Sequence, residues 1–232
     1  MNDDEAALNE FNGVARLFPL PGLVLFPHAV QPLHIFESRY REMAAEALAG
    51  DRLIAPVLLR AGWEEQYDLQ PAVYSVACLG RIVADQELPD GRYNLMLRGL
   101  ARVRIIDEPP CEKTFRQGRV EVLADVLSDD IDELMALRTA LADLILPRIT
   151  TGPIREQVQL LFHGELPLGQ VCDVLSFALP LAPEVKQDLL EITEVPDRAR
   201  RLMEAFRAVV SGPAKPTGAG TGKKFPPDFS DN

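Results

Sequence analysis

The segment from residue 17 to residue 43, LFPLPGLVLFPHAVQPLHIFESRYREM, is the feature that most restricts the fold of this chain. Four prolines interrupt an otherwise apolar run. A proline inside a helix removes a backbone hydrogen bond and clashes with the preceding turn, so the run cannot be one helix. It predicts short strands joined by proline-fixed turns, which enter a helix near Ser38.

Short apolar or alternating stretches dominate the first half of the chain and predict strands. We expect strands at residues 14–18, 23–26, 53–59, 76–84, 92–98, 100–106 and 118–126. Asp90-Gly91 is a turn pair, because glycine tolerates the positive φ that such turns require. Helical spacing of Tyr40, Met43, Ala44 and Ala47 predicts one helix in this half.

The second half of the chain is predicted to be helical. Asp130 precedes Glu133 by three residues, which is typical of a capping box. Further helices are expected over residues 154–163 and 169–179, and after the prolines at 183 and 196. Strands followed by helices in separate blocks indicate an α+β fold.

The predicted organisation has four parts. A β-rich subdomain spans residues 1–126, of which 1–12 form a flexible leader, and a helical subdomain spans residues 127–210. Residues 211–232 are rich in Gly, Pro and Lys without periodicity and are expected to be a flexible tail.

Charge and composition exclude several protein classes. The 232 residues carry a formal net charge of −11, whereas binding to nucleic-acid phosphates needs an excess of Lys and Arg. Residues 11–126 are nearly neutral at −2, and residues 127–210 carry −6. No segment is long and apolar enough to span a membrane, and the acidic start is not a secretory signal. Three distant cysteines favour a reducing compartment, so we expect a cytoplasmic location.

Motifs for catalysis or cofactor binding are weak. GAGTGKK in the tail lacks the first Gly and the Ser/Thr of a phosphate loop, and no G-x-S-x-G elbow occurs. Cys172 is expected to be a buried small hydrophobe. The three histidines lack metal-ligand spacing. Arg102 and Arg104 share a strand face, which is either a cationic stripe for an acidic peptide or a solvent face paired with acids. We expect no cofactor, no metal and no catalytic residue.

Several short motifs follow one another in a fixed order along the first half. They are LFPL at 17–20, VLFP at 24–27, PLHIFE at 32–37 with RY at 39–40, GRI at 80–82, LPDGRY at 88–93 and LRGLARV at 97–103. Together they resemble the N-terminal substrate-binding domain of Lon proteases, in the form found as free-standing small bacterial proteins. The resemblance covers roughly residues 14–210.

This resemblance implies a PUA-like barrel subdomain followed by a helical bundle, and a role in binding unfolded or extended polypeptide. The sequence departs from full-length Lon proteases, because only the tail 211–232 follows the resembling region, so we expect no ATPase, no Ser–Lys protease and no enzyme. The expected contact residues match family motif positions: Phe26, His34, Phe36, Arg39, Tyr40 and Arg98.

Two other hypotheses remain at the level of the sequence. One is a structural adaptor or regulator that binds a single folded partner, such as a protease or a chaperone. The other is a small hydrolase or an RNA-associated protein, which a PUA-like barrel would allow although the net charge disfavours RNA. The interpretation that we carry forward is a non-catalytic polypeptide-binding module without nucleic-acid or membrane partners.

Overall fold

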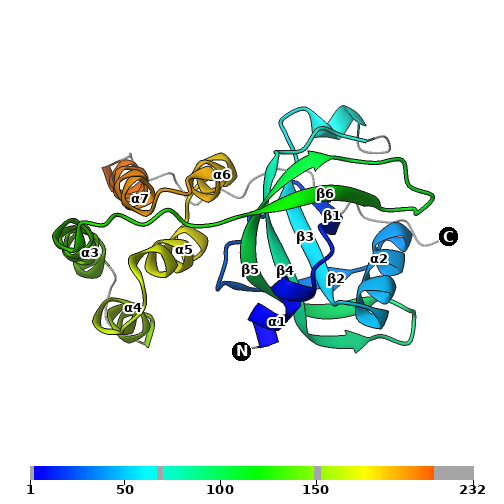
Figure 1. Cartoon of the computed structure of the whole chain (residues 1–232), viewed down its shortest axis with the longest axis horizontal. Helices are drawn as coiled ribbons and strands as arrows, with labels where there is room; N and C mark the ends of the chain where they lie inside the picture. The colour runs from blue at the N-terminus through cyan, green and yellow to red at the C-terminus, as the bar shows by residue number, and fades with distance from the viewer. Residues whose placement is uncertain (1–2, 67–69, 149–152, 212–232) are drawn as a thin grey trace.

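The computed structural model describes residues 3–66, 70–148 and 153–211. Figure 1 shows two parts side by side: a strongly curved sheet with two helices, and a group of helices reached from the last strand through an extended segment. This arrangement confirms the α+β class, with a β-rich barrel followed by a helical bundle. The predicted tail lies outside the described residues except for Ser211.

Six strands form the sheet in the order β2-β5-β4-β3-β1-β6. Their bounds are β1 (Val14–Leu20), β2 (Val30–Ile35), β3 (Leu53–Leu58), β4 (Val76–Glu87), β5 (Tyr93–Asp107) and β6 (Arg116–Leu123). An additional pairing of β6 with β5 closes the sheet into a barrel, and β2 extends from β5 as a separate edge. Closure removes the exposed edges that an open sheet would present.

Most predicted strands are confirmed, but the stretch at 23–26 forms no strand. Its residues Val24, Leu25 and Phe26 are buried in the core as a loop, because Pro21, Gly22 and Pro27 fix turns around them. The strand in this region is instead β2, further along. An apolar run thus indicated burial correctly and backbone conformation wrongly.

The two strands predicted on either side of Gly99 form one strand, β5. A Cβ at Gly99 would lie 2.0 Å from the carbonyl oxygen of Phe26, so only glycine lets the loop cross the strand at this distance. Glycine marks a close backbone approach here and does not interrupt the strand. The Asp90-Gly91 turn is as predicted, with a φ of +75° at Gly91.

A helix replaces part of the predicted flexible leader. Helix α1 (Asp3–Glu10) packs its Ala7 and Leu8, together with Phe11, against the core cluster of Ala15, Leu17 and other barrel residues. Its weak apolar periodicity explains why the sequence did not reveal it. Helix α2 (Ser38–Ala49) follows β2 directly, as the proline-rich segment predicted.

The helical part contains α3 (Ile131–Ile145), α4 (Pro153–His163), α5 (Leu168–Ala178), α6 (Pro183–Glu191) and α7 (Val195–Ser211). A short 3₁₀ turn, η2 (Leu146–Arg148), continues α3, and another, η1 (Trp63–Gln66), lies in the barrel part. The Asp130 carboxylate accepts from the Glu133 amide at 3.0 Å, as the capping-box pattern predicted. Cys172 is completely buried on α5, again as expected.

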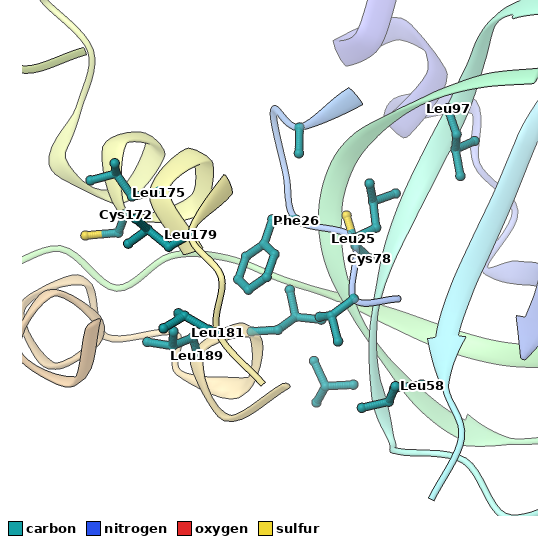
Figure 2. Packing of buried hydrophobic residues seen from close by; sticks show 14 of the residues in the cluster. Leu25, Phe26, Leu58, Cys78, Leu97, Cys172, Leu175, Leu179, Leu181 and Leu189 are labelled. Atoms are coloured by element: carbon teal, nitrogen blue, oxygen red, sulfur yellow. The ribbon is translucent and has the colours of Figure 1, made fainter. Parts of the chain in front are cut away.

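One apolar core runs through both parts of the molecule. Figure 2 shows the Phe26 ring between the helices that carry Leu175 and Leu189 and the sheet that carries Cys78. The helices are therefore packed onto the barrel and share its core. A side-chain link adds to this packing, since the Gln187 amide on α6 donates to the Val76 carbonyl on β4 at 2.9 Å.

Buried charges join the two parts as well. Arg102 on β5 donates to the Leu190 carbonyl at 2.9 Å and, through both terminal nitrogens, to the Asp173 carboxylate on α5. Arg198 on α7 donates to the same carboxylate at 2.8 Å and pairs with Asp125 at 2.7 Å. Burial alone would lower the pKa of Arg102, but the Asp173 carboxylate raises it above its usual value.

The two arginines predicted to share a face thus have different roles. Arg102 is buried in the junction and is part of no cationic surface stripe, because the helices cover this end of β5. Arg104 is exposed and pairs with Glu121 at 2.8 Å. For Arg104 the structure therefore supports the alternative of a solvent face whose arginines pair with acids.

We predict that Asp173→Ala lowers the free energy of unfolding by about 3–5 kcal/mol, because it leaves two buried guanidinium groups poorly compensated. Urea titration followed by circular dichroism measures the effect. The matched control is Glu121→Ala, which removes the partner of exposed Arg104 and should change the free energy by at most about 1 kcal/mol. Equal urea midpoints for the two variants would contradict the assigned role of Asp173.

Candidate functional site

A cavity of about 620 Å³ opens between the start of α2, the loop from β5 to β6, and the segment after β3. We call it the proline-lined cavity. Its lining residues are Pro19, Arg39, Tyr40, Leu59, Gln70, Pro71, Glu108, Pro109, Pro110, Cys111, Lys113, Thr114, Phe115, Arg116 and Gln117. Four prolines stiffen this lining, which combines apolar rings with charged and amide side chains.

The start of α2 positions two of the predicted contact residues in this cavity. The Arg39 guanidinium donates to the Glu37 carboxylate from Nε and Nη2, at 3.1 and 2.9 Å. Its centre lies 4.7 Å from the centroid of the Tyr40 ring, within the range of a cation–π contact. Tyr40 packs edge-on against Phe18, with 4.6 Å between ring centroids. Arg39 is therefore held flat against the wall of the cavity.

The opposite wall is tied to α2 and to the segment before β4 by polar contacts. Lys113 Nζ donates to Glu46 at 2.6 Å and Thr114 Oγ1 to Glu42 at 2.5 Å, both on α2. Arg116 donates to the carbonyl of Pro71 at 2.7 Å and pairs with Glu108 at 2.5 Å. The cations of the lining thus have carboxylate partners, and the cavity has no strong excess of charge.

The chemistry of this lining suits binding. Its apolar rings can pack against side chains of a ligand, and the half-buried arginines can donate hydrogen bonds to backbone carbonyls. Cys111 is exposed there, and its Sγ lies 3.2 Å from Gln117 Oε1. Across the described residues, no group of three or more His, Cys, Asp or Glu side chains could hold a metal ion. No helix in the described part of the chain is long and apolar enough to cross a membrane.

His34 and Phe36 lie at a different place, beside the edge strand β2. His34 Nδ1 is 2.7 Å from Asn94 Oδ1, and the His34 and Phe36 rings are stacked 6.1 Å apart. His34 lines a shallow hollow of about 420 Å³ formed by β2, β5 and β4. The six predicted contact residues therefore do not form one site.

The free edge of β2 is poorly suited to pairing with another strand. The Gly99 amide donates to the Ala29 carbonyl at 2.9 Å. In an antiparallel pair every second residue of a strand bonds to its neighbour, so the backbone nitrogen of Pro32, three residues after Ala29, points away from β5. Proline has no N–H to offer there, and the Gln31 side-chain amide occupies the Pro32 carbonyl at 2.7 Å. Such features are typical of edges protected against strand addition.

Phe26 and Arg98 lie elsewhere again. Phe26 is fully buried at the junction of barrel and helices (Figure 2), where it faces the core. Arg98 is on the side of β5 that faces away from the core cluster of Leu95 and Leu97, and it pairs with Asp4 of α1 at 3.4 Å. Of the predicted contacts, only Arg39 and Tyr40 line the proline-lined cavity.

The sequence did not predict five other cavity residues as contacts: Pro71, Pro109, Pro110, Phe115 and Arg116. The consecutive pair Pro109-Pro110 was a usable signal, because two prolines fix an extended backbone and expose apolar rings. Their proximity to Tyr40 depends on the closure of the barrel, which local sequence does not reveal.

Comparison with known proteins identifies relatives of this architecture. The profile of the family described as the ATP-dependent protease La (LON) substrate-binding domain matches residues 14–207. Lon protease 2 of Herpetosiphon aurantiacus is 30% identical over 210 residues, covering 87% of this chain and 25% of that protein. Lon protease 2 of Myxococcus xanthus is 26% identical over 197 residues, covering 82% and 23%. The chain thus spans about a quarter of the length of these curated relatives.

Two solved structures share the fold. A Lon N-terminal domain protein from Xanthomonas campestris has a TM-score of 0.59 and 24% identity, covering 82% of this chain and 97% of that one. The N-terminal domain of a Lon protease from the Mycobacterium avium complex has a TM-score of 0.61 and 18% identity, covering 84% and 98%.

We predict a late alkaline titration step from Tyr40, since burial raises the pKa of its phenol to about 12. Its contribution to stability is complete below pH 10.0, the ordinary value, and is lost as the pH rises towards 12, because the unfolded chain ionises first. Tyrosinate absorbance, together with urea midpoints across this range, measures both effects. Tyr40→Phe should remove the late step, and its persistence in that variant would assign it to another tyrosine.

Proposed function

We propose that this chain, which belongs to the LON substrate-binding domain family, is a non-catalytic module that binds unfolded or extended polypeptide. The description of the family as a substrate-binding domain supports the proposal. The curated Lon relatives match only over about a quarter of their own length, so their proteolytic activity is not transferred to this chain.

The observation that carries the proposal is the proline-lined cavity. A lining that combines proline rings with half-buried arginines and amides can hold side chains of an extended peptide and hydrogen-bond its backbone without any reactive group. Addition of the peptide as a strand to β2 is less favourable, because Pro32 and Gln31 protect that edge. We therefore place the polypeptide in the cavity, with Arg39 and Tyr40 among its contacts.

The composition of the cavity also supports binding without catalysis. Cys111 is the one thiol of the lining, and its polar neighbours are the Gln117 amide, the Lys113 backbone amide and the Lys113 ammonium. Nucleophilic attack by a thiol is commonly assisted by a histidine base, and the described residues that line the cavity include no histidine. The net negative charge further supports a polypeptide over a nucleic acid as the ligand. The three free cysteines support the cytoplasmic location that we propose.

An adaptor that binds one folded partner is the second candidate. Exposed apolar side chains on and before α3 favour it: Leu127, Ile131 and Met135 are each more than 60% exposed. Patches of this kind occur at interfaces between folded proteins. The two candidates differ in ligand, since an adaptor would not bind a denatured model protein.

Selective alkylation of Cys111 offers a direct test of the cavity. Cys78 and Cys172 are buried and burial raises the pKa of both thiols, that of Cys172 to about 12, so a maleimide should react at Cys111 alone. A bulky maleimide adduct would fill part of the cavity. We expect it to lower the affinity for a reduced, carboxymethylated model protein by roughly tenfold or more, corresponding to about 1.4 kcal/mol.

Fluorescence anisotropy of the labelled model protein measures the affinity, and mass spectrometry verifies a single adduct. The control is Cys111→Ala treated with the same reagent, which should bind as well as the untreated chain. Unchanged binding after alkylation would rule out the cavity as the polypeptide site. Absence of binding by the untreated chain, with capture of one folded partner, would instead favour the adaptor.

A further inference from the structure

We propose that Arg81 on β4 and Arg98 on β5 form a second interaction surface, which takes a short acidic helix with a few apolar side chains and which α1 occupies in this structure. We call it the Arg81–Arg98 surface. It shares no lining residue with the proline-lined cavity. The proposal therefore goes beyond the polypeptide-binding function and does not depend on it.

The two arginines face each other across neighbouring strands. Arg81 and Arg98 are direct register partners in the β4–β5 pair, and their side chains are 25% and 46% exposed. Like charges in this position repel each other and destabilise the strand pair unless an anion lies between them. The sheet thus presents two adjacent cations that need a negatively charged partner.

Helix α1 supplies that partner from its first turn. Asp4 bridges the pair, with Oδ1 at 3.5 Å from Arg81 Nη1 and Oδ2 at 3.4 Å from Arg98 Nη1. Asp3 adds a longer contact of 3.9 Å to Arg81. Among the described residues, these two aspartates are the carboxylates that pair with either arginine. The carboxylates that the two arginines need therefore come from a short segment outside residues 14–207, the range that matches the family model.

The same helix provides an apolar contact next to the charges. Ala7, Leu8 and Phe11 follow Asp4 at spacings of three, four and seven residues and pack on the inner core cluster of the barrel. These spacings place Asp4, Ala7 and Leu8 on one face of α1, and Phe11 follows directly after its last residue. The ligand chemistry is therefore defined: a carboxylate in the first turn, followed by apolar side chains at i+3, i+4 and i+7.

The packing of α1 is loose enough to allow exchange. The helix has eight residues, none of them fully buried, and helices this short are marginal alone. A hollow of about 310 Å³ separates it from the turn after α2 and is lined by Asp3, Glu10, Asp51, Arg52 and Arg81 among others. Of the charged groups facing this hollow, Arg52 is already paired with Asp85 and hydrogen-bonded to the Ile82 carbonyl. A partner helix of the same chemistry can thus compete with α1.

The test uses the full chain and a fluorescent peptide with the sequence of residues 1–12, MNDDEAALNEFN. In the double variant Asp3→Lys, Asp4→Lys, charge repulsion should release α1 and expose the surface. We expect the affinity of this variant for the peptide to be higher than that of the unmodified chain by roughly tenfold or more. In the unmodified chain α1 occupies the site, so the apparent affinity is reduced in proportion to the fraction of molecules whose site is free. Amide hydrogen exchange in residues 3–10 reports independently whether α1 has been released.

Adding Arg98→Glu to the double variant should abolish the gain in peptide affinity. Adding Arg104→Glu is the matched control, since Arg104 is an exposed arginine on the same strand that pairs with Glu121, and it should leave the gain intact. An unlabelled peptide with both aspartates changed to Asn should fail to compete. The proposal is overturned if residues 3–10 exchange rapidly in the double variant while its peptide affinity equals that of the unmodified chain, or if Arg98→Glu has no more effect than Arg104→Glu.

Discussion

The buried carboxylate of Asp173 is the interaction on which the arrangement of the two parts depends. It lies between a guanidinium from the barrel, Arg102, and one from the last helix, Arg198. Buried charges are costly unless they are paired and hydrogen-bonded, so alternative placements of the helices that separate these groups carry a large penalty. The apolar contacts around Phe26 favour association of the two parts, whereas the ionic contacts specify one geometry for it.

This fixed geometry has consequences for the surfaces of the molecule. Because the helices cover one end of the barrel, the two barrel surfaces that we propose for ligands lie on its other sides: the proline-lined cavity beside α2, and the strands beneath α1. Each surface combines apolar contacts with arginines already held by carboxylates. Both are therefore prepared for ligands that offer apolar groups together with hydrogen-bonding or acidic groups, which is the chemistry of polypeptides.

Local sequence predicted most of the elements and fewer of the contacts. The prolines, the Asp90-Gly91 turn and the Asp130 cap each act on residues a few positions away, so the local sequence is enough to predict their effects. Arg102 and Arg104 look equivalent by alternation, but helices from the second half of the chain bury one of them. Phe26 matches a motif that suggested a contact residue, and its burial follows from the loop that crosses Gly99. Only part of the candidate site was predicted from the sequence. Arg39 and Tyr40 were expected contacts, whereas the facing wall of the cavity consists of residues about 70 positions further along the chain.

The pairing of β1 with β6 also bears on how the chain reaches its fold during synthesis. Val14 pairs with Arg119, and β1 is flanked on its other side by β3 in parallel register. The barrel consequently cannot close until residues near 120 have left the ribosome, and the ionic junction must wait for Arg198. Pairings this distant in sequence form slowly and leave apolar strands exposed in the meantime. A nascent chain of this protein therefore presents the same kind of surface that the finished molecule is proposed to recognise.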